Sequence, residues 1–259
     1  MAKFVEVIND SGVVSVDDTM ERMHLVRSVE LTDIGVTYDV SPYTSNPGEA
    51  EMIRRIRTRV ITLGNNEEFF AIRAKGNRPK VGFACGFKGG NVVNLYEYIN
   101  NGGSVNDESN FVLDFYGVGQ TRVNNVGLQA FDENGGLVFS SSEYYENVKG
   151  TYNSAIDDGG QTRVLDNPTY WPHSISLGGF SPVSSAVIIN SCKHSHATDA
   201  LADTLYVVVF DGDIHLERRY LWSLDYSHVN YSIVNAGLMY YPPYSMVNSG
   251  IIISADGIN

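Results

Sequence analysis

Basic residues are scarce in this chain of 259 residues, which has 18 lysines and arginines against 30 aspartates and glutamates. The formal net charge is therefore −12 at pH 7. A surface of this sign repels nucleic-acid phosphates and anionic lipid headgroups. We therefore expect no nucleic-acid partner and no docking on an acidic membrane.

Long apolar runs are also absent. The longest, such as residues 206–210 and 251–253, have the length of strands and are far too short to span a bilayer. The first twelve residues contain no apolar run of signal-peptide length. The sequence therefore predicts a protein that is made in the cytoplasm and is not inserted into a membrane.

Cysteine and the common catalytic motifs are missing as well. Cys85 and Cys192 stand alone, without a C-x-x-C pair, so no disulfide framework is expected. Neither the nucleophile motif G-x-S-x-G nor the phosphate-binding loop G-x-x-x-x-G-K-[ST] occurs. The sequence predicts a protein that is not an enzyme and has no cofactor.

The residues that are abundant favour strands and turns. Glycine (25) and tyrosine (16) are frequent, and low charge combined with these residues is typical of β structure. Apolar runs at 110–116 and 205–210 predict buried strands, and the alternating segment 213–222 follows a hairpin signal at Asp211-Gly212. The best helix candidate is 47–57, which has acidic residues first and basic residues last. We predict a mainly β, all-β fold with at most one or two short helices.

A hairpin pattern occurs twice, 123 residues apart. Each copy is an apolar strand, a polar turn with glycine at the same place, and a second strand with alternating apolar residues. The aligned pairs are Ile8 with Phe131, Gly12 with Gly135, Val14 with Leu137 and Val16 with Phe139. A further similarity, between residues 60–64 and 174–178, has a shift of 114. These internal similarities predict a duplication into two related β-sandwich-like domains, 1–123 and 124–259.

The second hairpin resembles a segment of tailed-bacteriophage proteins from the tail-tip and tail-fibre region. Their pattern is G-L-Q-V-F-(D/N)-x-x-G-x-(V/L)-x-F-D-S-S. The matching residues are Gly127, Leu128, Gln129, Phe131, Asp132, Gly135, Leu137, Phe139, Ser141 and Ser142. Ser140 stands where the family often has Asp, and residues 5–7 replace Gly-Leu-Gln in the weaker copy at 4–28. The resemblance covers about 20–25 residues in each half.

The resemblance implies a virion structural protein of a phage tail, located at the tail tip or associated with the fibre. Such a protein would mediate assembly, with other tail proteins as partners, and would itself form a homo-oligomer and take part in host attachment. An alternative of a different class is a receptor-binding module that recognises a host cell-surface glycan. Both readings place the protein in the virion after its synthesis in the host cytoplasm.

Aromatic residues are the candidates for ligand binding. The run Tyr240-Tyr241-Pro242-Pro243-Tyr244, together with Trp171, could form a surface on which a sugar or another protein stacks. The alternative is that these rings are ordinary core and corner residues, since proline after paired tyrosines marks the end of a strand.

One cluster has residue types that bind metals. His194 and His196 would lie on one face of a strand, and Cys192 and Asp199 are close in sequence. The spacing matches no common zinc pattern, and a polar loop is the alternative. The acidic, glycine-rich segments 132–135 and 157–160 lack the spacing of a calcium loop. We therefore predict no metal site.

Overall fold

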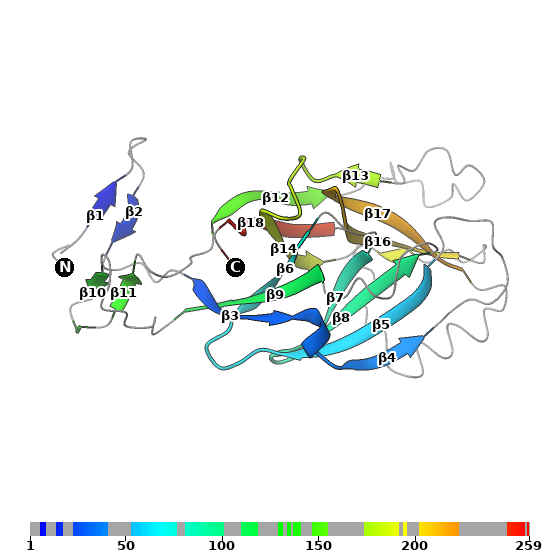
Figure 1. Ribbon diagram of the computed structural model, residues 1–259, viewed down its shortest axis with the longest axis horizontal. Coiled ribbons are helices and arrows are strands. Elements are labelled where there is room, and N and C mark those ends of the chain that lie inside the picture. The colour runs from blue at the N-terminus through cyan, green and yellow to red at the C-terminus, as the bar shows by residue number, and fades with distance from the viewer. Residues whose placement is uncertain are drawn as a thin grey trace.

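The computed structural model describes residues 6–8, 14–17, 23–40, 53–76, 81–100, 110–118, 129–131, 134–135, 137–140, 147–154, 174–191, 194–195, 202–222, 248–256 and 258. Almost all of them lie in antiparallel strands, with one short 3-10 helix, η1 (Leu31–Asp33). The strands form two large sheets and two separate hairpins (Figure 1). The prediction of an all-β, sandwich-like architecture is confirmed.

The first large sheet has six strands. Their order across the sheet is β12 (Val148–Ser154), β18 (Asn248–Ser254), β14 (Ser185–Ser191), β6 (Phe69–Ala74), β9 (Phe111–Gly117) and β3 (His24–Glu30). The predicted buried strand at 110–116 corresponds to β9, whose seven residues are all buried.

The second large sheet has eight strands. Its main order is β13 (Ser174–Ser176), β17 (Asp213–Trp222), β16 (Ala202–Asp211), β7 (Val81–Gly89), β8 (Val92–Asn100), β5 (Ile53–Thr62) and β4 (Val36–Val40). The eighth strand, β15 (His194–Ser195), pairs with β16 outside this order. The predicted turn between β16 and β17 is present, with Gly212 at a φ of 71°.

Aromatic packing joins the two sheets in the core. The rings of Phe83 (β7) and Phe210 (β16) belong to the eight-stranded sheet, and Phe111 (β9) reaches them from the six-stranded sheet. All three are fully buried and meet edge to face, with centroids 4.8 Å, 5.5 Å and 5.9 Å apart. The core therefore lies between the sheets and draws on residues from both sides of position 123.

Each sheet is continuous across the predicted boundary at 123/124. In the six-stranded sheet β6 pairs with β14, with Ile72 opposite Val187, and in the eight-stranded sheet β7 pairs with β16, with Gly82 opposite Val209. The two halves thus do not form separate sandwiches among the described strands, because they share both sheets.

Strand order nevertheless repeats on the two sides of these central pairs. Outward from the centre, the six-stranded sheet reads β6, β9, β3 on one side and β14, β18, β12 on the other. The eight-stranded sheet reads β7, β8, β5 and β16, β17, β13. In chain order these strands correspond one to one, and β5 and β13 end 114 residues apart, at Thr62 and Ser176. The duplication itself stays a prediction.

The two hairpins have the same register. The first consists of β1 (Glu6–Ile8) and β2 (Val14–Asp17), and the second of β10 (Gln129–Phe131) and β11 (Leu137–Ser140). Adding 123 to each paired residue of the first hairpin gives the corresponding pair of the second: 6 and 17 become 129 and 140, 7 and 16 become 130 and 139, and 8 and 14 become 131 and 137. In both hairpins the pairing register also shifts between the second and third of these pairs.

The same shift continues into the next strand of each half. In β3 the pairing with β9 is irregular between Leu25 and Arg27, and in β12 the pairing with β18 is irregular between Val148 and Gly150. The shift of 123 takes Leu25 to Val148 and Arg27 to Gly150, so the two bulges occupy equivalent positions. The alignment seen in the sequence therefore extends without a gap from the hairpin to the edge strand.

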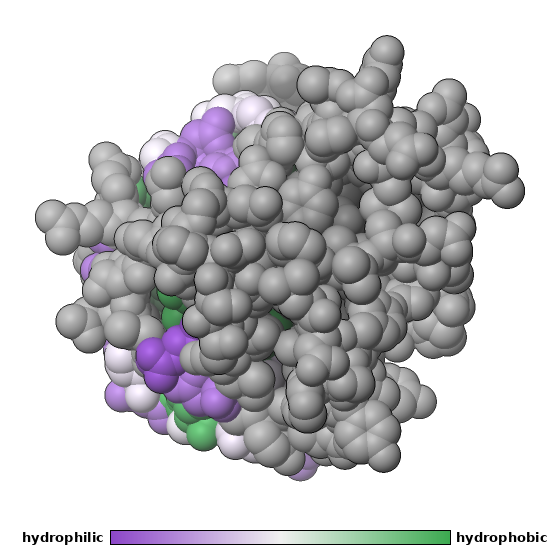
Figure 2. Space-filling model, turned by 90° about the vertical axis from the view of Figure 1, so that its right-hand side faces the viewer, coloured by the Kyte–Doolittle hydropathy of each residue, from purple (hydrophilic) through white to green (hydrophobic). Residues whose placement is uncertain are grey.

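Figure 1 shows both hairpins at one end of the long axis of the molecule, beyond β3 and β9. Figure 2 views the opposite end, where the described residues in sight are largely hydrophilic with small hydrophobic areas between them. Among the described residues, the large apolar side chains that are most exposed include Phe131 of β10, at 44%.

The helix predicted at 47–57 is wrong over its described part, because residues 53–57 belong to β5. Residues 47–52 lie outside the described part of the chain. The charge gradient that favours a helix is a weak local effect, whereas β5 is hydrogen-bonded to β4 on one side and to β8 on the other. Tertiary pairing therefore overrides the local signal.

Candidate functional site

A row of charged side chains crosses the inner face of the eight-stranded sheet. Arg55, Arg57 and Arg59 alternate along β5, so their side chains leave the same face. Arg57 lies opposite Asp39 of β4 on one side and opposite Glu97 of β8 on the other. Glu97 in turn lies opposite Phe83, whose ring packs on the other sheet, and this places the row inside the sandwich.

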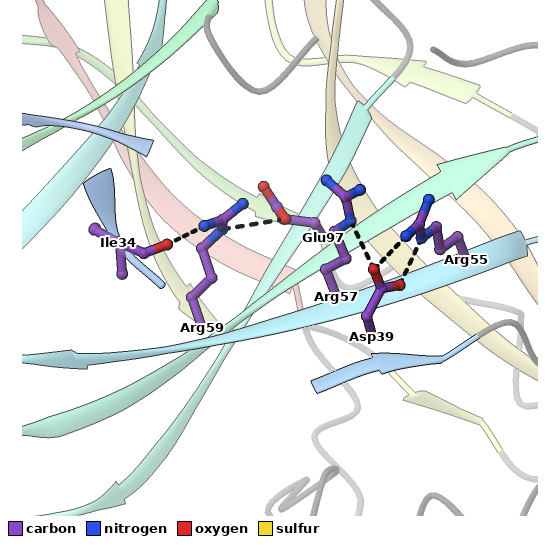
Figure 3. Close-up of polar contacts among 6 residues, drawn as sticks. All are labelled: Ile34, Asp39, Arg55, Arg57, Arg59 and Glu97. Atoms are coloured by element: carbon purple, nitrogen blue, oxygen red, sulfur yellow. Dashed lines mark hydrogen bonds and ion pairs between the residues drawn. The ribbon is translucent and has the colours of Figure 1, made fainter. Parts of the chain in front are cut away.

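The contacts form two groups that lie next to each other (Figure 3). At the inner end, Arg59 Nε donates to Glu97 Oε2 at 3.3 Å, and Arg59 Nη1 donates to the carbonyl oxygen of Ile34. At the outer end, Arg55 forms a two-point contact with Asp39, in which Nε donates to Oδ1 at 2.5 Å and Nη2 donates to Oδ2. Arg57 Nε lies 3.4 Å from Asp39 Oδ2, and Arg57 is the residue opposite Glu97 in the strand pairing, so it stands between the two groups.

Burial increases steeply along the row. The side chains of Arg55 and Asp39 are 34% and 33% exposed, whereas those of Arg59 and Glu97 are each 1% exposed. Removing two charges from water costs several kcal/mol per ion. The Arg59–Glu97 pair therefore forms only because the two side chains are held in place against each other. Pairing between adjacent strands provides this positioning.

The two carboxyl groups respond to their surroundings in opposite directions. Burial raises the pKa of Glu97, and the nearby positive charges of Arg59 and Arg57 oppose this rise only in part. The hydrogen bond from Arg55 lowers the pKa of Asp39, with the charges of Arg55 and Arg57 acting in the same direction against a smaller effect of burial. Asp39 is therefore the ionised anchor at the surface, and Glu97 is the group whose charge is costly.

The contacts of this row hold neighbouring segments of the chain together. Guanidinium groups stay protonated and cannot exchange protons near neutral pH, and Glu97 is covered by the sandwich. Through the carbonyl of Ile34, the row fixes the connection that carries the chain from β3 in one sheet to β4 in the other. The row therefore ties two strands and a crossover connection together at one end of the core.

A second polar group lies on the outer face of β17. The imidazole of His215 faces two carboxylates, with Nδ1 3.6 Å from Asp213 Oδ1 and Nε2 3.5 Å from Glu217 Oε2. Ser176 of β13 donates a hydrogen bond to Asp213. Because the carboxylates flank opposite sides of the ring, one metal ion could not bind all three groups. Among the described residues, no set of three His, Cys, Asp or Glu side chains is arranged to hold a metal.

Most of the residues predicted from sequence cannot be placed. Trp171, Tyr240, Tyr241 and Tyr244 lie outside the described residues, as do His196, Cys192 and Asp199. His194 lies in β15, where only the backbone is described. The glycan-binding alternative, which depends on the aromatic residues, therefore stays a prediction.

The charged row itself was missed by sequence reasoning, although a signal was present. Residues 55–60 read R-I-R-T-R-V, with an arginine at every second position. A period of two indicates a strand whose arginines all lie on one face. The acidic partners, Asp39 and Glu97, belong to separate strands. Nothing local in the sequence identifies them.

Comparison with known proteins finds no matching family model, no curated protein and no solved structure. Within the described part of the chain, no helix has the length and apolar character needed to cross a membrane.

Arg59 and Glu97, the inner ion pair, should be coupled in their effect on the free energy of unfolding. Arg59→Met should lower the free energy of unfolding by about 3–5 kcal/mol, since it leaves Glu97 buried without its main partner. Combining it with Glu97→Leu should cost clearly less than the sum of the two single changes, because the double variant buries no unbalanced charge. Urea unfolding measures all three variants.

Arg55→Met serves as the matched control. This arginine is on the same strand and face but a third exposed, and its loss should cost about 0–1 kcal/mol. Strictly additive losses for Arg59→Met and Glu97→Leu would show that the two groups do not act as a pair.

The raised pKa of Glu97 gives a pH dependence with a definite sign. The folded state holds the Glu97 proton more tightly than the unfolded chain does, so stability should fall as the pH rises from about 4.3, the ordinary pKa of glutamate, through the higher folded value. Unfolding free energies of wild type and Glu97→Gln between pH 3 and 8 test this. The wild type should lose stability relative to the variant over that range.

In the same experiment, Asp39→Asn should show the opposite dependence of stability on pH. The pKa of Asp39 is lowered on folding, so its contribution should be present above about pH 3.9 and lost as the pH falls through the folded value. A stability difference between wild type and Glu97→Gln that stays constant with pH would mean that burial does not control the ionisation of Glu97.

Proposed function

We propose that this chain is a structural component of a bacteriophage tail, located at the tail tip or associated with the fibre. Its role there is assembly: it packs against other tail proteins, forms a homo-oligomer and contributes to host attachment. The proposal begins with the resemblance of residues 127–142 to the hairpin segment of such proteins.

The observation that carries the proposal is the repeated hairpin. The segment that bears the resemblance folds as β10 and β11, and the weaker copy folds as β1 and β2 with the same register and the same irregularity. Neither hairpin contributes a strand to the large sheets. A pair of such elements at one end of a β-sandwich suits a protein whose work is contact with other chains.

The edges of the six-stranded sheet support contact through the hairpins rather than through sheet extension. Both edge strands, β3 and β12, carry a bulge at equivalent positions. Bulges at an edge disrupt the row of hydrogen-bonding groups that another strand would need. Growth by edge-to-edge pairing is thereby disfavoured, and other surfaces are left for assembly.

The proposal predicts that this chain is present in purified phage particles at a fixed, small copy number. Mass spectrometry of particles from the phage that encodes it, calibrated against a major tail protein, measures that number. A symmetric tail component should give a small integer such as three or six. Absence from the particle, or a copy number that varies between preparations, would refute the tail-component proposal.

A further inference from the structure

We propose that the two hairpins are equivalent docking arms, which bind the same kind of site on two copies of one partner subunit. Each site would be an apolar pocket with a positively charged rim. This inference rests on the proposed assembly function and specifies the partner surface that it requires.

In both halves, the described hairpin strands pair only with each other. They form two-stranded sheets of their own, outside the six-stranded and eight-stranded sheets. An isolated two-stranded hairpin is marginally stable in water. Yet the halves, which differ at most positions, share the pairing of these hairpins residue by residue. A common binding role explains this equivalence.

In the second hairpin, buried and exposed residues lie close together. Ala130 and Ser140 are 5% and 0% exposed, so part of the hairpin is seated against the chain, which restricts its position. Phe131, paired across the hairpin with Leu137, is 44% exposed. An exposed aromatic residue on a positioned element is the usual form of an anchor that fills an apolar pocket.

Charge defines the rim of the partner site. Residues 6–17 contain Glu6, Asp10 and Asp17 and no lysine or arginine, and residues 129–140 contain Asp132 and Glu133 and no lysine or arginine. In each hairpin an apolar residue, Ile8 or Phe131, precedes the acidic turn. Complementary potential across an interface therefore requires a basic surface around the pocket.

Two equivalent arms fit a partner that offers the same site twice. Both hairpins lie at one end of the molecule (Figure 1), where one neighbour can contact both. A symmetric oligomer presents identical sites at fixed spacing. Binding through both arms raises the effective concentration for the second contact, and avidity can exceed the affinity of either arm by about 10²–10⁴.

Competition for incorporation into particles tests the proposal. Cells infected with a phage that lacks this gene express the wild-type chain together with one variant, and mass spectrometry of purified particles gives the ratio of their peptides. Phe131→Ala and Ile8→Ala should each be under-represented by about tenfold, to a similar degree, because Phe131 is exposed and Ile8 is its counterpart at the shift of 123. The double variant should be incorporated less than either, and Asp132→Lys should also be excluded.

Val183→Ala is the control, because Val183 is an exposed apolar residue of similar exposure (46%) in the sandwich, and it should compete equally with wild type. All variants should unfold at the wild-type temperature, since the hairpins lie outside the large sheets. If wild type enters particles and both hairpin variants compete like the control, or if only one hairpin matters, the inference of equivalent arms is overturned while the tail function stands. If wild type itself is absent from particles, the proposed function fails.

Discussion

The structure depends on the pairing of β6 with β14 and of β7 with β16. Each of these strands would otherwise be a sheet edge with unpaired backbone groups, and each finds its partner in the other half of the chain. Close approach at the second junction requires a glycine: a Cβ on Gly82 would lie 2.4 Å from Cγ2 of Val207. The two central pairings make two half-sandwiches into one core, and they leave the equivalent hairpins at one end of the molecule.

Equivalent positions in the two halves are held by different chemistry. After its bulge, β3 is tied to the connection between β5 and β6 by the ion pair of Arg27 with Glu67, and the Arg27 guanidinium lies 3.8 Å from the centre of the Phe115 ring. At the position of Arg27 in the second half stands Gly150, and the ring of Phe180 lies against it. The charged row, as far as the structure describes it, is built from strands and a connection of the first half.

Sequence reasoning succeeded where the signal is local or periodic. The all-β fold, the strands at 110–116 and 213–222 and the presence of both hairpins follow from alternation, apolar runs and the placement of glycine. It failed at 53–57, where charge order favoured a helix and long-range pairing made a strand. The partners Asp39 and Glu97 were out of reach for the same reason, because each joins Arg57 through strands far away in sequence. The sharing of both sheets between the halves is also a long-range property, which a repeat alone does not predict.

Native-state hydrogen exchange of the full chain, resolved by peptide, is the most direct test of this shared core. If the central pairings unite the halves, the amides of β6, β7, β14 and β16 should open with one common free energy, which equals that of global unfolding. The amides of the hairpins should exchange at a much lower free energy. Opening of β14 and β16 at a free energy well below that of β6 and β7 would show that the halves are independent units and would contradict the single sandwich.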